Sequence, residues 1–103
     1  MDVRTFMDKN LEHTGKEGLL IITMEECSEL IKEVSKIIRK NDNLHISNID
    51  TLSPLAEEIA DVELMTSQLK HAFNLEIVVE IEKQRKKERQ LRRIEDEQCK
   101  SNR

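Results

Sequence analysis

Apolar residues recur every three or four positions along most of the chain, the spacing expected for one face of an α-helix. The longest series, from about residue 18 to 40, comprises Leu20, Cys27, Leu30, Ile31, Val34, Ile37 and Ile38. A second series comprises Leu55, Ile59, Val62, Met65, Leu69 and Phe73. In neither series do apolar and polar residues alternate, as they would in a half-buried strand. The pattern therefore predicts packed helices.

Helix-breaking residues divide the chain into four predicted helices. These helices span residues 2–13, about 18–40, from Pro54 to about 73, and about 75–98. Gly15 is a suitable left-handed stop for the first helix, and Asn74 marks the break before the last. The stretch 41–54, rich in Asn, Asp and Ser, predicts a loop. It ends in Ser53-Pro54, where Ser suits the N-cap and Pro the first helical position.

Composition supports an all-α fold and argues against a sheet protein. Aromatic residues make up 2% of the chain, which has two Gly and one Pro, too few for many strands joined by tight turns. We expect one domain, residues 1–103, with a basic helix and polar tail from about residue 82. A domain near 100 residues buries only about two-thirds of its unfolded surface. We therefore predict a helical hairpin or four-helix bundle that is completed by homo-oligomerisation, as a dimer or tetramer.

The net charge of −4 makes nucleic acid an unlikely partner for the whole chain. The charge is uneven, because residues 83–93 hold seven basic side chains and one acidic, a local +6. Cys27 and Cys99 form no CxxC motif, which favours free thiols in a reducing compartment. The N-terminus lacks an apolar signal segment, and the longest apolar run, Leu19–Ile22, is too short to span a membrane. We expect a cytoplasmic protein with no membrane partner.

Acidic residues gather on the second and third predicted helices. The first group is Glu25, Glu26, Glu29 and Glu33, and the second is Glu57, Glu58 and Asp61. At about 100° per residue, Glu58 points within about 40° of the apolar residues Val62, Met65 and Leu69. A carboxylate directed at an apolar stripe is costly unless a cation meets it.

Two readings of these acidic groups stay open at this point. They can be solvated helix faces, for which Lys32, Lys36 and Lys40 supply partners. Alternatively, two pairs that lie beside the apolar stripes, Glu26 with Glu29 and Glu58 with Asp61, can share a cation. Oxygen ligands without His or Cys suit Mg²⁺ or Mn²⁺. A P-loop and a Glu-x-x-His motif are both absent from the sequence. These absences argue against a Walker-type nucleotide site and a di-iron carboxylate bundle.

Two motifs resemble those of a known family, the MazG-like nucleotide pyrophosphohydrolases. Met24–Leu30 (MEECSEL) resembles the EExxE motif of that family, and Glu57–Val62 (EEIADV) resembles its ExxD motif. The intervening positions hold a helix end, a polar loop and a helix start, as in that all-α superfamily. The resemblance covers roughly residues 15–90 and is nearest to the short phage and bacterial members.

The resemblance implies an activity and a role for each matching residue. Family members use Mg²⁺ to hydrolyse a nucleoside triphosphate at the α–β linkage, which gives a monophosphate and pyrophosphate. By position, the implied metal ligands are Glu26, Glu29, Glu58 and Asp61. Glu25 is implied either to support these ligands or to orient the attacking water. Lys83, Lys86 and Arg89 are the implied phosphate-binding residues.

A different class of function fits part of the same sequence. A non-catalytic helical protein could use residues 83–93 to bind nucleic acid or an acidic partner, with its acidic helices solvated. That reading leaves Glu58 directed at apolar neighbours without a counter-ion.

Overall fold

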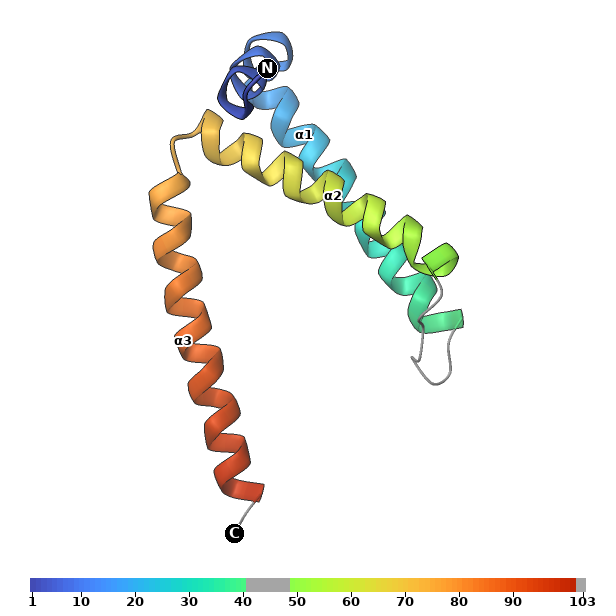
Figure 1. Cartoon of the computed structure of the whole chain (residues 1–103), viewed down its shortest axis with the longest axis vertical. Helices are drawn as coiled ribbons and strands as arrows, with labels where there is room; N and C mark the ends of the chain where they lie inside the picture. The colour runs from blue at the N-terminus through green and yellow to red at the C-terminus, as the bar shows by residue number, and fades with distance from the viewer. Residues whose placement is uncertain (41–48, 102–103) are drawn as a thin grey trace. The chain divides into compact units, whose positions relative to one another are not determined.

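The computed structural model describes residues 1–40 and 49–101, which form three α-helices and no strand. Helix α1 spans Val3–Lys40, α2 spans Ile49–Ala72 and α3 spans Glu76–Ser101 (Figure 1). The predicted all-α fold is confirmed. None of these helices combines the length and apolar character that a membrane span requires.

The first two predicted helices form one element, α1, with a kink at Gly15. There the backbone leaves helical geometry, with φ of 77° and ψ of 162°. The predicted break is therefore in place, but Gly15 adopts an extended, glycine-specific conformation rather than a left-handed helical one. At the start of α1 the Asp2 carboxylate accepts a hydrogen bond of 2.8 Å from the Thr5 amide, which caps the helix.

Helix α2 begins earlier than the sequence predicts. Its first residue is Ile49 and Pro54 lies inside it, so the predicted start at Pro54 is wrong. Near the helix N-terminus a proline removes only one backbone hydrogen bond, which the rest of the helix can offset. The predicted loop at 41–54 falls partly on residues 41–48, which lie outside the described residues. The predicted break after α2 is present at Asn74, which has φ of 56°.

Helices α1 and α2 pack against each other as an antiparallel hairpin (Figure 1). Among the described residues, the buried apolar side chains between them are those of Leu19, Met65 and Ala72, which are 2%, 8% and 5% exposed. Leu11, Ile22 and Leu69 pack around these side chains and are partly buried. The segment before Gly15 is also tied to the end of α2, because Asp8 Oδ1 lies 2.6 Å from His71 Nε2.

The chain divides into two compact units, residues 1–73 and 74–103. The first is the hairpin, and the second is α3 with the residues that flank it. The acidic motifs belong to the first unit, whereas the basic segment 83–93 lies on α3 in the second.

Candidate metal site and basic helix

Three carboxylates from the two hairpin helices meet at one place. Glu26 comes from α1, and Glu58 and Asp61 come from α2. One carboxylate oxygen from each lies within 4.8 Å of the others. Glu58 and Asp61 are three residues apart, so their side chains lie on the same face of α2, where Glu58 is half-buried and Asp61 is exposed. The antiparallel packing of the hairpin brings Glu26 opposite this pair.

Glu58 is the most constrained member of the cluster. Its Oε2 atom is buried and has no hydrogen-bond partner among the described residues. Burial raises the pKa of the Glu58 carboxyl, and so do the negative charges of Asp61, Glu29 and Glu33. The pKa of Glu26 is raised too, first by burial, then by the negative charge of Asp61 and by a side-chain hydrogen bond between Glu26 and Asp61. A cation would relieve both effects, because it would neutralise the repulsion and coordinate the unpaired oxygen.

Two of the predicted site residues stand apart from this cluster. The Glu29 side chain is 48% exposed, and its Oε1 accepts a hydrogen bond of 3.1 Å from Lys32 Nζ. It is still close enough for its charge to raise the pKa of Glu58. Glu25 is exposed and does not belong to the group of three. The structure thus brings together Glu26, Glu58 and Asp61, but not Glu25 or Glu29.

Glu33 is a neighbour of the site to which the sequence reasoning gave no role. Its side chain is 19% exposed, its Oε1 accepts a hydrogen bond of 3.0 Å from Lys36 Nζ, and its charge raises the pKa of Glu58. The signal was present in the sequence, because Glu33 follows Glu26 by seven residues. Two helical turns return a side chain to nearly the same face.

The donor set of the cluster fits a hard divalent cation. All three groups offer carboxylate oxygens, and no His or Cys takes part among the described residues. Mg²⁺ and Mn²⁺ favour such oxygen ligands, whereas Zn²⁺ sites usually include His or Cys. The Oε2 atom of Glu58 therefore gives the cluster one ligand atom that no group in residues 1–40 or 52–101 binds.

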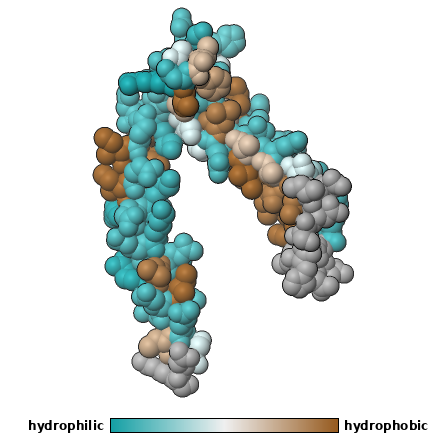
Figure 2. All heavy atoms as spheres, viewed as in Figure 1, coloured by the Kyte–Doolittle hydropathy of each residue, from teal (hydrophilic) through white to brown (hydrophobic). Residues whose placement is uncertain are grey.

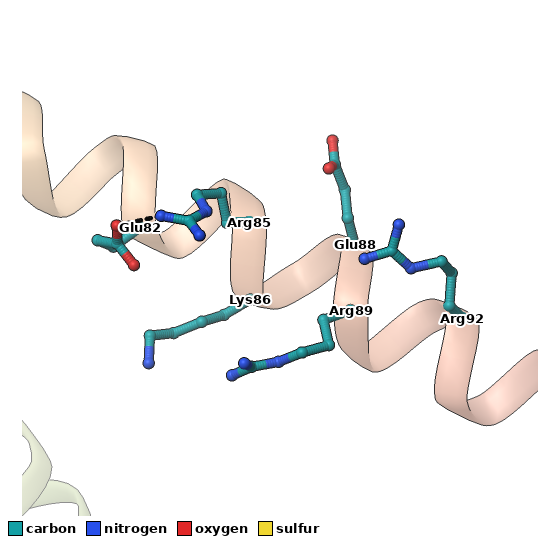
Figure 3. A pocket seen from close by; sticks show the side chains of 6 residues that line it. All are labelled: Glu82, Arg85, Lys86, Glu88, Arg89 and Arg92. Carbon is teal, nitrogen blue, oxygen red and sulfur yellow. Dashed lines mark hydrogen bonds and ion pairs between the residues drawn. The ribbon is translucent and has the colours of Figure 1, made fainter.

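The predicted phosphate-binding residues lie on α3, where they divide into two sets. Lys86 and Arg89 line a groove of about 230 Å³ together with Glu82, Arg85, Glu88 and Arg92. Their two side chains extend toward the same side of the helix (Figure 3). Lys83 does not line this groove, and its Nζ instead donates a hydrogen bond of 3.3 Å to Glu80 Oε1. Arg85 is held by Glu82 at 2.9 Å.

Comparison with known proteins leaves the chain unassigned to a family. No protein-family model matches it, and it matches neither a curated protein nor a solved structure.

Proposed function

We propose that the protein is a Mg²⁺-dependent nucleotide pyrophosphohydrolase, which cleaves a nucleoside triphosphate at the α–β linkage to a monophosphate and pyrophosphate. One observation carries the proposal. Glu58 Oε2 is buried beside Glu26 and Asp61 and has no hydrogen-bond partner among the described residues. A carboxylate cluster that is costly without a cation is expected where a cation is part of the function. The motif resemblance then indicates which reaction that cation would support, the hydrolysis of a nucleoside triphosphate.

In this proposal Glu26, Glu58 and Asp61 hold the cation, and Mn²⁺ can replace Mg²⁺. Glu29 joins them when its carboxylate leaves Lys32, a change at an exposed ion pair that costs little because such pairs contribute little stability. Bound Mg²⁺ supplies charge neutralisation on the phosphate oxygens and a lower pKa for the attacking water. Glu25 lies next to Glu26 on the exposed side of α1 and orients that water.

Lys86 and Arg89 bind the phosphates of the substrate in this scheme. They are the two predicted cations that share one groove and extend to the same side of α3. Arginine can hold a phosphate through two parallel hydrogen bonds, and lysine adds a compact positive charge. Lys83 has the weaker case, because it is engaged by Glu80.

The small core supports a further part of the proposal, that the protein is a homo-oligomer. In the part of the hairpin whose burial is described, three apolar residues are buried, which is few for a stable domain. Association would bury apolar side chains that the single chain leaves in solvent.

Product analysis tests the catalytic proposal. The full chain is incubated with a panel of ribonucleoside and deoxyribonucleoside triphosphates and Mg²⁺, and phosphorus NMR separates pyrophosphate from orthophosphate. The proposal predicts a monophosphate and pyrophosphate in equal amounts from at least one nucleotide, and none when EDTA removes the metal. Diphosphate with orthophosphate would contradict the reaction, and no turnover on any nucleotide would contradict the activity.

A second candidate function rests on α3 alone. Arg85, Lys86, Arg89 and Arg92 line one groove, and α3 belongs to a compact unit separate from the acidic hairpin. In this reading the protein binds nucleic acid through that basic surface and catalyses nothing. Such binding would weaken steeply with added salt, since each phosphate contact releases counterions. A variant with Lys86 and Arg89 changed to Ala distinguishes the two functions. Its nucleic-acid binding and its nucleotide turnover are each compared with those of wild type.

A further inference from the structure

Basic residues are scarce in the part of the hairpin that holds the acidic cluster. In residues 17–38 of α1, Lys32 and Lys36 are the basic residues, and residues 52–69 of α2 contain no lysine, arginine or histidine. The same two stretches hold nine acidic side chains, five in the first and four in the second. Two lysines therefore stand against a large excess of negative charge.

Each of these lysines pairs with a glutamate that precedes it by three residues. Lys32 Nζ lies 3.1 Å from Glu29 Oε1, and Lys36 Nζ lies 3.0 Å from Glu33 Oε1. Both glutamates act on the cluster, because their negative charges raise the pKa of the Glu58 carboxyl. The lysines therefore neutralise two of the charges that disfavour the Glu58 carboxylate.

The lysines belong to the acidic side of α1 and not to its apolar side. A lysine can also serve to cover apolar surface with its methylene stem. At 100° per residue, however, Lys32 points about 100° and Lys36 about 140° away from Ile31, an exposed apolar residue of α1. Figure 2 shows apolar side chains in a band along the hairpin, with hydrophilic side chains beside it. Covering that apolar surface does not explain the two lysines.

The two ammonium groups can leave their partners at little cost. The Lys32 and Lys36 side chains are 64% and 50% exposed, and exposed ion pairs contribute little stability. The flexible stem of lysine lets the ammonium move into solvent. The Glu33 side chain, in contrast, is only 19% exposed. Its negative charge is partly desolvated, so Glu33 depends more on a counter-ion than an exposed glutamate does.

We propose that Lys32 and Lys36 are internal counter-ions of the acidic cluster, which stabilise the hairpin without metal and compete with the divalent cation. Their positive charges repel the cation, and Glu29 can join it only after leaving Lys32. Both effects lower the affinity of the cluster for Mg²⁺. The lysines thereby set the Mg²⁺ concentration at which the cluster fills. The inference rests on the cation site of the proposed function and concerns the regulation of that site, not its reaction.

Isothermal titration calorimetry of the full chain with Mg²⁺ at low ionic strength tests the inference. Lys32→Gln and Lys36→Gln should each lower the Kd for Mg²⁺ roughly two- to fivefold, and the double variant roughly tenfold, because each change removes a competing charge. Lys32→Arg and Lys36→Arg keep the charge and should bind Mg²⁺ no more tightly than wild type. The control is Lys9→Gln, at an exposed lysine of α1 on the other side of the Gly15 kink, which should leave the Kd unchanged.

Thermal melts give a second readout that separates competition from a merely structural role. Without metal, both Gln variants should melt below wild type, and Lys36→Gln more so because Glu33 is partly desolvated. With Mg²⁺ they should gain more in Tm than wild type does. Ion pairs that only stabilise the helix would lower Tm equally with and without Mg²⁺. A variant that is unfolded without metal should fold when Mg²⁺ is added, and failure to do so would overturn the competition.

The titrations distinguish failure of this inference from failure of the cation site. If wild type binds Mg²⁺ and the Gln variants of Lys32 and Lys36 bind it equally or more weakly, the counter-ion role is overturned and the site stands. If wild type binds no Mg²⁺, the cation site is overturned, and the inference with it. Equal tightening by Lys9→Gln would show a general effect of net charge and would overturn the assignment to these two lysines.

Discussion

Replacement of Glu58 by Gln tests the acidic cluster most cleanly, because it removes one charge and preserves the shape of the side chain. Without metal, the Glu58 carboxylate is disfavoured by burial and by the charges of Asp61, Glu29, Glu33 and Glu57. Gln carries no charge and therefore avoids both effects. We expect Glu58→Gln to melt at a higher temperature than wild type at neutral pH when no divalent cation is present.

With Mg²⁺ the order should change, because wild type should gain more stability from the ion than Glu58→Gln does. A ligand that binds only the folded state stabilises it by RT ln(1 + [L]/Kd), about 2.7 kcal/mol at 100 times Kd. For a domain of this size 1 kcal/mol moves Tm by roughly 4–8 °C, so wild type should gain roughly 10–20 °C at that concentration. Glu58→Gln loses one of three clustered carboxylates and should gain little.

Thermal melts followed by circular dichroism, with and without Mg²⁺, measure both effects in one experiment. The matched control is Glu63→Gln, the same change at an exposed position of α2 outside the cluster. It should leave the Mg²⁺ response as in wild type. If Glu58→Gln melts below wild type without metal, or if it keeps the full Mg²⁺ gain, the cluster is not a cation site that Glu58 completes.

Three further predictions concern the hairpin. Because the pKa values of Glu26 and Glu58 are raised above the ordinary value of 4.5, the folded state holds extra protons just above that pH; metal-free Tm should fall as the pH rises from 4.5 through the raised pKa values, and a Tm that rises instead would contradict the shifts. Gly15→Ala should lower the free energy of unfolding in urea by about 1–3 kcal/mol, since φ of 77° strains a residue with a Cβ, and an unchanged value would argue against the kink. Leu19→Ala should lower it by about 2–5 kcal/mol, because Leu19 is the most deeply buried side chain described, and a loss below 1 kcal/mol would show that the core lies elsewhere.

The helical class and the main breaks of the fold could be predicted because they depend on local signals. Apolar spacing identified the helices, and Gly15 and Asn74 marked real breaks, since both adopt a positive φ. The start of α2 could not be predicted in this way. Ser53-Pro54 has the features of a helix start, but proline is also tolerated a few residues inside a helix. The extension of α2 back to Ile49 places Leu52 in a half-buried position, which local signals do not reveal.

Helical spacing predicted which acidic residues share a face of their own helix, but not which of them meet across the hairpin. Spacing placed Glu58 and Asp61 on one face of their helix, and the structure sets Glu26 across from them. It could not separate Glu26 from Glu29, because both lie near the inner side of α1. The difference arises from tertiary structure, since α2 packs over Glu26 while Glu29 stays in solvent with Lys32.

Lys86 and Arg89 illustrate the same limit on the basic helix. Their spacing of three residues predicts a shared face, and both do line one groove. Lys83 has the same spacing from Lys86, yet its ammonium is engaged by Glu80. Which of several neighbouring cations is available depends on the acidic partners within one turn, and the sequence offers several such partners on α3.

The measurement that tests the central claim most directly is pyrophosphate release by wild type, Glu58→Gln and Glu63→Gln, side by side with the same nucleotide and Mg²⁺. The account predicts pyrophosphate and monophosphate from wild type and Glu63→Gln, and a loss of at least about 100-fold in Glu58→Gln, as expected when a group that binds the catalytic ion is removed. Equal rates for wild type and Glu58→Gln, or no pyrophosphate from any of the three, would contradict it.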